Sequence, residues 1–338
     1  MRILRTLVCW VAGLLFAELA AQQQFLVMEY NVENLFDCRH DSLKDDMMYM
    51  PESPRGWTHS RFNDKINHIS KVILASSGRQ VPDIIGLCEV ENKYCAESLV
   101  KYSPLRAAGY EYVITESPDV RGIDVLLLYH PYTFRLLHKN SIRIPTESIG
   151  GRPTRDILHV SGEVVSGDTL DVFLCHFPSR FGGQRASEPY RLLAAEYLKN
   201  AADSVMSSRQ NPYIIIMGDF NDYPDNKSIR EVIGASKPGT DVNNNTLYNL
   251  MDGKPGGTYR YRGEWGILDQ MIVNGRMLKS GSISTDYSKA HIIKYPFLLE
   301  EDEKYGGTAP FRTYVGMRYH GGYSDHLPVI LELEISEN

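Results

Sequence analysis

Two short polar segments of this chain combine metal-binding oxygens with an imidazole, and each adjoins an apolar run. Gly218-Asp219-Phe220-Asn221 follows the apolar residues 213–216, and Asp325-His326 precedes the apolar residues 329–333. Short apolar runs bounded by turn residues predict buried strands, so these polar groups lie at the ends of rigid elements. Carboxylate and amide oxygens bind Mg²⁺ or Ca²⁺, and a histidine exchanges protons near neutral pH.

Four more polar residues occupy the same kind of position. Asn31, Glu89 and His176 each follow an apolar run, whereas Asp269 begins one. Strand ends at one edge of a layered sheet protein converge, so we expect these side chains to share a pocket. Each residue alone has a simpler interpretation: Asp219 suits a turn, Asn31 a strand-end cap and His176 a buried core. Their joint occurrence favours a site.

The elements that must position these residues follow no strict strand–helix–strand rhythm. This mixture predicts an α/β fold, a four-layered α/β/β/α sandwich in which two mixed sheets pack face to face with helices outside. No linker divides the chain, so we expect a single domain over residues 22–338. The predicted strands are 25–30, 84–88, 112–115, 123–129, 135–137, 157–164 and 169–175, the predicted helices 59–76, 95–108 and 188–206, and the predicted long loop or insertion 285–322.

The N-terminus has the pattern of a secretory signal peptide. Arg2 and Arg5 precede the apolar residues 7–16, and small residues follow as far as Ala21. We therefore expect residues 1–21 to be a signal peptide and the protein to be periplasmic or secreted. An N-terminal membrane anchor is the alternative, but the apolar stretch is short for a membrane span. After cleavage we expect no stable membrane insertion, and no obligate protein partner is evident.

The net charge and the cysteines limit the function only weakly. The chain of 338 residues carries a net charge of −6, and loss of Arg2, Arg5 and Glu18 with the signal peptide makes it −7. An acidic surface of this kind is no general polyanion binder, although a local basic cleft would still permit nucleic acid. Four cysteines remain, and their disulfide status stays open, because two lie in apolar runs where a free cysteine acts as a small hydrophobe: Cys38, Cys88, Cys95 and Cys175.

Six short segments occur in an order that resembles the endonuclease/exonuclease/phosphatase superfamily, the group of deoxyribonuclease I. The resemblance extends from Phe25 to Leu333, and the first and last segments are most similar to exported members from Bacteroidetes. Each segment alone is a weak signal, whereas six in the same order are specific. They are Glu29-Tyr30-Asn31-Val32-Glu33-Asn34, Gly86-Leu87-Cys88-Glu89-Val90, Cys175-His176-Phe177-Pro178-Ser179-Arg180, Gly218-Asp219-Phe220-Asn221, Ile267-Leu268-Asp269-Gln270 and Ser324-Asp325-His326.

The resemblance implies a metal site and a set of catalytic groups. Glu89 would be the main ligand of Mg²⁺, with Mn²⁺ or Ca²⁺ as alternatives, and Asn31 and Asp325 would complete the shell directly or through water. Asp219 and Asn221 would position the attacking water and the phosphate, or hold a second metal.

The remaining implied roles belong to groups that move protons or bind phosphate. His326 would be a general base or a phosphate contact, and Asp269 would orient its ring. His176 would bind a phosphate oxygen or protonate the leaving oxygen. Arg155 would clamp the phosphate, unless it is simply a surface strand residue, and Asp124 would support His176.

The implied function is hydrolysis of phosphodiester bonds by a metal-dependent, exported enzyme. Segments 220–222 and 268–270 depart from those of the inositol-polyphosphate 5-phosphatases, which favours a diesterase. A nuclease is the first expectation. A phospholipid or small-molecule phosphodiesterase or phosphatase, similar to a sphingomyelinase, is the second, and a catalytically silent binding protein is the third. The motifs of serine hydrolases, P-loop NTPases and zincins do not occur in the sequence.

Overall fold

The structure is a computed structural model that describes residues 22–76, 78 and 80–336. The predicted signal peptide, residues 1–21, lies outside the described residues. Within the described part of the chain, no helix has the length and apolarity that a membrane crossing requires. The four cysteines after residue 21 are free thiols, and Cys88 and Cys175 are buried, as their apolar surroundings predict.

Sheet 1 has seven strands, in the order β13-β19-β1-β2-β4-β3 with β14 also paired to β19. It is mixed, because β1 runs parallel to β2 and antiparallel to β19. Its strands are β1 (Gln22–Leu35), β2 (Ile84–Val90), β3 (Glu111–Ile114), β4 (Asp124–Tyr129), β13 (Ile283–Ser284), β14 (Ala290–Ile292) and β19 (Val329–Ser336).

Sheet 2 has six strands, in the order β5-β6-β7-β8-β12-β9. It is also mixed, because β7 runs parallel to β8 and antiparallel to β6. Its strands are β5 (Phe134–Ile142), β6 (Ile157–Val164), β7 (Thr169–His176), β8 (Tyr213–Asp219), β9 (Leu247–Asn249) and β12 (Asp269–Asn274).

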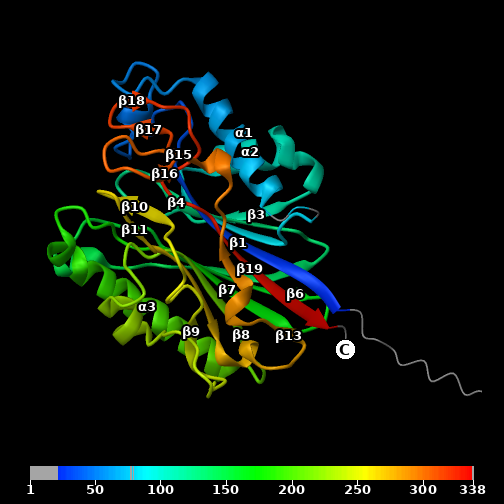
Figure 1. Ribbon diagram of the computed structural model, residues 1–338. Coiled ribbons are helices and arrows are strands. Elements are labelled where there is room, and N and C mark those ends of the chain that lie inside the picture. The colour runs from blue at the N-terminus through cyan, green and yellow to red at the C-terminus, as the bar shows by residue number, and fades with distance from the viewer. Residues whose placement is uncertain (1–21, 77, 79, 337–338) are drawn as a thin grey trace, which may run out of the picture.

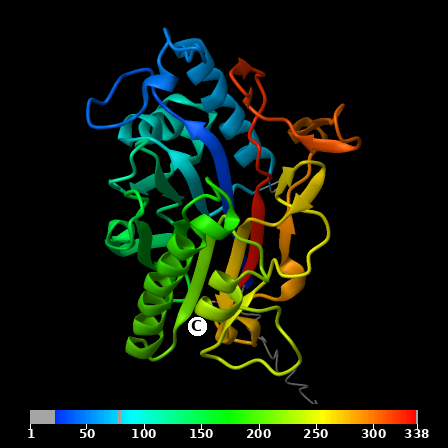
Figure 2. The same cartoon turned by 90° about the vertical axis from the view of Figure 1, so that its left-hand side faces the viewer.

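The two sheets pack face to face, and helices cover their outer faces (Figures 1 and 2). One apolar core lies between the sheets and draws on both of them, for example Val27 of β1 and Ile215 of β8. Alternate residues of β1, such as Met28, face the opposite way, onto α1 (His59–Ala75) and α2 (Lys93–Tyr102). The helix α3 (Gln184–Ser208) covers sheet 2. The predicted α/β/β/α sandwich is confirmed.

The helix predicted over 95–108 is divided in the structure. The helix α2 ends at Tyr102, and a 3-10 helix, η2 (Pro104–Ala108), follows. Ser103 is extended, with φ −116° and ψ 175°, because a residue that precedes proline avoids the helical region. Its hydroxyl accepts a hydrogen bond from the N–H of Leu105 and so caps the second helix.

The segment 285–322, predicted as a loop or insertion, contains short paired strands anchored to the rest of the molecule. The buried Lys65 of α1 donates hydrogen bonds of 2.5 Å to the hydroxyl of Thr313 and to the carbonyl oxygen of Tyr323. The segment includes β14 and the hairpins β15 (Leu299–Glu301) with β16 (Thr308–Pro310) and β17 (Tyr314–Val315) with β18 (Arg318–Tyr319). The remaining elements are β10 (Tyr259–Tyr261), β11 (Glu264–Gly266), η1 (Met47–Tyr49), η3 (Thr146–Ile149), η4 (Ser228–Ile233), η5 (Gly275–Leu278), η6 (Tyr287–Lys289) and η7 (Pro296–Leu298).

Candidate active site

The register of sheet 2 places three of the predicted residues side by side. His176 at the end of β7 pairs with Asp219 at the end of β8, and Asp219 pairs with Asp269 at the start of β12. Gly218 makes this approach feasible, because its φ is 139° and a Cβ there would lie 1.9 Å from the carbonyl oxygen of Cys175. The strand-end positions therefore converge, as the sequence predicts.

Sheet 1 contributes Asn31 and Glu89 through two irregular strands. Asn31 pairs with Cys88, and Glu89 lies in a bulge between β2 and β4 with a φ of 67°. Bulges redirect side chains, and positive φ in a residue other than glycine is retained mainly where function requires it. Glu89 Oε2 accepts a hydrogen bond of 2.9 Å from the N–H of Asn34, while Oε1 lies 3.8 Å from His176 Nε2. Glu89 thus reaches from sheet 1 to sheet 2.

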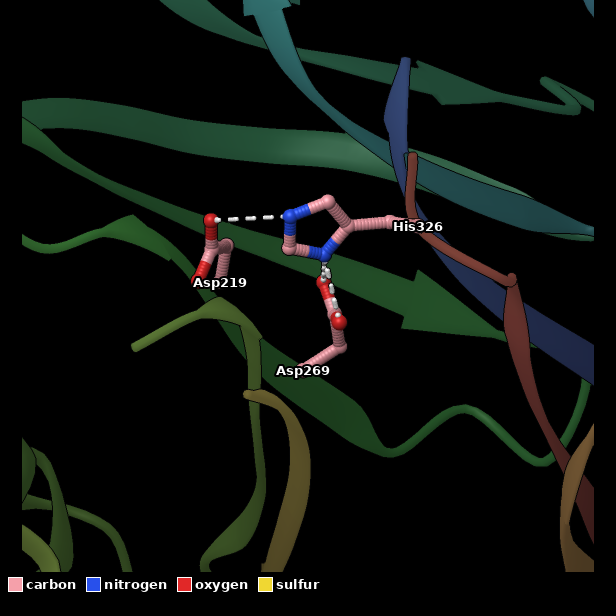
Figure 3. A group of neighbouring side chains, drawn as sticks. All are labelled: Asp219, Asp269 and His326. Carbon is pink, nitrogen blue, oxygen red and sulfur yellow. Dashed lines mark hydrogen bonds and ion pairs between the residues drawn. The ribbon is translucent and has the colours of Figure 1, made fainter. Parts of the chain in front are cut away.

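His326 lies between two carboxylates (Figure 3). Its Nδ1 is 2.8 Å from Asp269 Oδ2, and its Nε2 is 3.9 Å from Asp219 Oδ2. Although burial opposes a charged ring, Asp269 and Asp219 hold the pKa of His326 well above its usual value. Because Asp269 occupies Nδ1, Nε2 is the atom left to meet a substrate. The ring of Tyr259 packs against the imidazole, with 4.9 Å between the ring centroids.

The carboxylate of Asp219 is fixed by two amides. Its Oδ2 accepts hydrogen bonds from Asn31 Nδ2 at 3.0 Å and from Asn221 Nδ2 at 3.3 Å, and Oδ1 accepts one from the N–H of Asn221 at 2.8 Å. Burial raises the pKa of Asp219 to about 7, against the opposing effect of His326. The structure therefore brings Asn31, Asn221 and Asp219 together as one hydrogen-bonded group.

His176 is buried and faces the same group. Its Nε2 lies 3.6 Å from Asp219 Oδ2, while its Nδ1 has no hydrogen-bond partner among the described residues. The prediction that Asp124 supports His176 is wrong. Asp124 instead accepts hydrogen bonds from the hydroxyl of Thr115 at 2.5 Å and from the N–H of Ser117 at 3.0 Å. These hydrogen bonds close the loop between β3 and β4. Their donors lie seven and nine residues from Asp124, whereas His176 belongs to the other sheet.

Arg155 and Asp325 are both held by other side chains. The buried Arg155 donates from Nη1 to Asp119 Oδ2 at 3.2 Å and from Nη2 to the carbonyl oxygen of Phe177 at 2.5 Å. Asp325 Oδ2 accepts a hydrogen bond of 2.7 Å from Arg312 Nη2. The structure therefore shows Arg155 as a buried neighbour of the site rather than an exposed strand residue. A role for Asp325 as a ligand would require it to share its carboxylate with Arg312.

Two residues near the site have no role in the sequence prediction. Glu29 of β1 is fully buried, and its Oε2 has no hydrogen-bond partner among the described residues. Burial, together with Asp269 and Asp219, raises the pKa of Glu29 well above its usual value. The alternation of β1 could have revealed it, since Glu29 follows the inward-facing Phe25 and Val27. Nothing in the sequence marks the other residue, Arg312.

The donor set fits a hard divalent cation. Asp219, Asp269 and His326 each offer one ligand atom, and these atoms lie within 4.8 Å of one another. Glu89 adds a further carboxylate, because its Oε1 lies 3.8 Å from His176 Nε2, the same ring nitrogen that faces Asp219. Carboxylates crowded in a buried site repel one another, and a divalent cation relieves that repulsion. This group differs from the predicted ligands Asn31, Glu89 and Asp325, although Asn31 adjoins it through a hydrogen bond of 3.0 Å to Asp219.

Several solved structures share this fold. An endonuclease/exonuclease/phosphatase family protein from Bacteroides thetaiotaomicron is 14% identical, with a TM-score of 0.56 over 93% of this chain and 98% of that one. TDP2 from D. rerio, complexed with a single-strand DNA product, is 13% identical, with a TM-score of 0.54 over 92% and 98%. A mannosyl-6-phosphatase from B. thetaiotaomicron is 17% identical, with a TM-score of 0.54 over 91% and 99%. At these identities the likeness concerns the fold.

The sequence itself supplies the remaining evidence. No curated protein matches this chain significantly. Residues 26–335, however, match the sequence pattern of a family of phosphoester-cleaving enzymes, and this range includes every residue of the candidate site. The chain therefore belongs to the Endonuclease/Exonuclease/phosphatase family.

Proposed function

We propose that this protein is a divalent-metal-dependent hydrolase of phosphodiester bonds. The observation that carries the proposal is the meeting of both sheets at His176, whose Nε2 lies 3.8 Å from Glu89 Oε1 and 3.6 Å from Asp219 Oδ2. The site thereby joins a carboxylate suited to a metal ion with groups that exchange protons. This combination fits phosphoester hydrolysis.

Mg²⁺ is the proposed ion, held by Glu89 with Asn31 and Asp325 bound directly or through water. Mn²⁺ or Ca²⁺ would suit the same oxygens. Magnesium commonly binds through one or two carboxylates and retains several waters, so few protein ligands suffice. When bound, the ion neutralises charge that develops on the phosphate oxygens. Asp219 and Asp269 offer the second position, should two ions be used.

The side chains of the protein handle the protons. Asp219, oriented by Asn221, accepts the proton of the water that attacks phosphorus, and the bond to the leaving oxygen breaks. His326 Nε2 donates a hydrogen bond to a phosphate oxygen, because Asp269 holds the opposite ring nitrogen. His176 Nε2 faces the same space and donates to the phosphate or to the leaving oxygen.

Nucleic acid is the first proposed substrate class, and a phospholipid or other small phosphoester is the second. The net charge of −6 favours the second class, because long polyanions are repelled. TDP2 complexed with a DNA product and a mannosyl-6-phosphatase show that both kinds of phosphate compound occur among proteins of this fold.

A substrate panel tests the activity. Purified protein without residues 1–21 is incubated with bis-p-nitrophenyl phosphate, plasmid DNA, RNA and sphingomyelin, in Mg²⁺ or in EDTA. We expect hydrolysis of bis-p-nitrophenyl phosphate in Mg²⁺ and none in EDTA, because the carboxylates alone cannot neutralise the phosphate. Cleavage of sphingomyelin alone among the natural substrates would replace the nuclease assignment by the second class. Hydrolysis that persists in EDTA would refute the metal dependence.

Export is a separate proposal that rests on residues 1–21. Arg2, Arg5 and the apolar residues 7–16 have the pattern of a cleaved signal peptide. Mass spectrometry of the protein recovered from the periplasm or medium should find Gln22 as the first residue. Recovery of the intact chain from the cytoplasm alone would contradict export.

A further inference from the structure

A cavity of about 520 Å³ lies beside the candidate active site, and of its lining residues only Arg155 has a role in the account above, as an implied phosphate contact. We name it the arginine pocket after three of its lining residues, Arg121, Arg152 and Arg155. We propose that the arginine pocket binds a second phosphate group of the same substrate molecule whose phosphoester is cleaved. The inference rests on the proposed function and specifies its substrate class.

The arginine pocket adjoins the active site through Arg155 and Phe177. Arg155 Nη2 and Asn221 Nδ2 both donate to the carbonyl oxygen of Phe177, at 2.5 Å and 3.1 Å. The two residues that follow Phe177, Pro178 and Ser179, line the pocket. One backbone carbonyl thus links a pocket residue to the active-site amide, and the proposal places the two phosphates of one substrate on the two sides of this link.

The pocket presents more positive than negative charge. Its three arginines face only two carboxylates, those of Asp45 and Asp119. Asp119 is engaged by Arg155 at 3.2 Å and lies 3.9 Å from Arg121 Nε. Arg152 is exposed and forms no ion pair within the described part of the chain. A guanidinium that protein carboxylates leave free is a binding group for a phosphate.

Two buried donors in the pocket wall also lack acceptors. Arg155 Nε and the hydroxyl of Thr154 have no hydrogen-bond partner among the described residues, although the two side chains are only 5% and 3% exposed. Buried polar groups are nearly always paired, so two unpaired donors are an unusual feature of this wall. Both atoms are enclosed by protein, so a phosphate would reach them only after a shift of the neighbouring side chains.

The remaining wall suits the carbon skeleton that joins the two phosphates. Tyr190 and Phe181 line the pocket, and Phe181 is 86% exposed. The start of α3, which carries no side-chain cap, borders the same space through Ser187, and the positive end of a helix dipole favours an anion. A volume of this size accommodates a small ligand such as a nucleoside.

The test compares two substrates that differ only by a second phosphate. They are the p-nitrophenyl ester of thymidine 5′-phosphate and the same compound with a 3′-phosphate. We expect the 3′-phosphate to raise kcat/KM about tenfold or more, the range for hydrogen bonds to charged groups. Arg152→Ala should remove this gain and leave hydrolysis of bis-p-nitrophenyl phosphate unchanged. The matched control Arg106→Ala, an exposed arginine of η2 outside the pocket, should retain the gain.

Binding measured by calorimetry separates this inference from the proposed function. Thymidine 3′,5′-bisphosphate should bind the wild-type protein, and Arg152→Ala should weaken the Kd about tenfold. If the protein hydrolyses nothing yet shows this Arg152-dependent binding, the proposed function fails and the pocket assignment stands. Equal kcat/KM for the two substrates, or equal losses on all substrates in Arg152→Ala, would overturn the inference.

A third substrate identifies the source of the second phosphate. In it a second thymidine esterifies the 3′-phosphate, which makes the group a diester as in a nucleic acid. A larger gain from the diester than from the free 3′-phosphate assigns the pocket to a neighbouring backbone phosphate. A larger gain from the free 3′-phosphate assigns it to a small doubly phosphorylated compound.

Discussion

Replacement of Glu89 by Gln is expected to lower kcat/KM for Mg²⁺-dependent hydrolysis about a thousandfold, the equivalent of about 4 kcal/mol of transition-state stabilisation. The carboxylate that would hold the ion becomes a neutral amide of nearly the same shape. The fold should persist, because a glutamine oxygen can still accept the hydrogen bond from the N–H of Asn34. Initial rates on bis-p-nitrophenyl phosphate over a Mg²⁺ titration, with thermal unfolding as the check on the fold, measure the effect.

Glu97→Gln is the matched control for this variant. Glu97 lies on α2 and pairs with Lys101 at 3.0 Å on the surface, where solvent and salt screen an ion pair and its contribution to stability is small. The Glu97→Gln protein should hydrolyse the substrate at the wild-type rate. A Glu89→Gln protein that keeps both its rate and its Mg²⁺ dependence would show that Glu89 is not a metal ligand.

The second large effect is expected for Asp269→Asn, which should reduce kcat about 10²- to 10⁴-fold, the range for loss of a group that assists proton transfer. The amide no longer stabilises a charged His326, and it can present a donor to Nδ1 where the carboxylate presents only acceptors. The ring then loses both its fixed orientation and its charge. Single-turnover rates at saturating substrate separate this effect from substrate binding.

The chain offers a second histidine–aspartate pair as a control. Asp171 of β7 lies 3.0 Å from His159 Nε2 and also pairs with Arg209. Asp171→Asn should lower stability and leave the rate unchanged, whereas Asp269→Asn should do mainly the reverse. The double variant Asp269→Asn with His326→Gln should be no slower than the slower single variant, because the two residues act as one unit. Additive losses would show that they act independently.

The sequence predicts most of this site because its residues lie at strand ends. A polar residue at the end of an apolar run locates His176 and Asp219, and one at the start of a run locates Asp269, without knowledge of which strands are neighbours. Hydrogen bonding between the strands then fixes their register, so the residues meet once the sheet forms. The two-sheet fold was predictable from a similar pattern. Apolar strand-like runs mixed with helical segments indicate that sheets and helices form layers, but they do not indicate the order of the strands within each sheet.

The rest depends on loop conformations that decide which side chains meet. Asp124 accepts hydrogen bonds from Thr115 and Ser117, and Asp325 accepts one from Arg312. These partners depend on the conformation of loops, which the periodicity of the sequence does not reveal. The positive φ of Glu89 is likewise invisible, because glutamate is not a residue that usually marks a bulge. Strand patterns therefore predict where polar groups gather, but not which of them pair.

The division of the site between two sheets has a consequence for the order in which this enzyme becomes competent during folding. Neither half of the chain holds a complete reaction centre, since Asn31 and Glu89 belong to one layer and His176, Asp219 and Asp269 to the other. A nascent chain that lacks its C-terminal residues therefore has an incomplete site, because His326 lies just before the last strand, β19. Completion of the candidate site is thereby tied to the pairing of the last strand, β19, with β1.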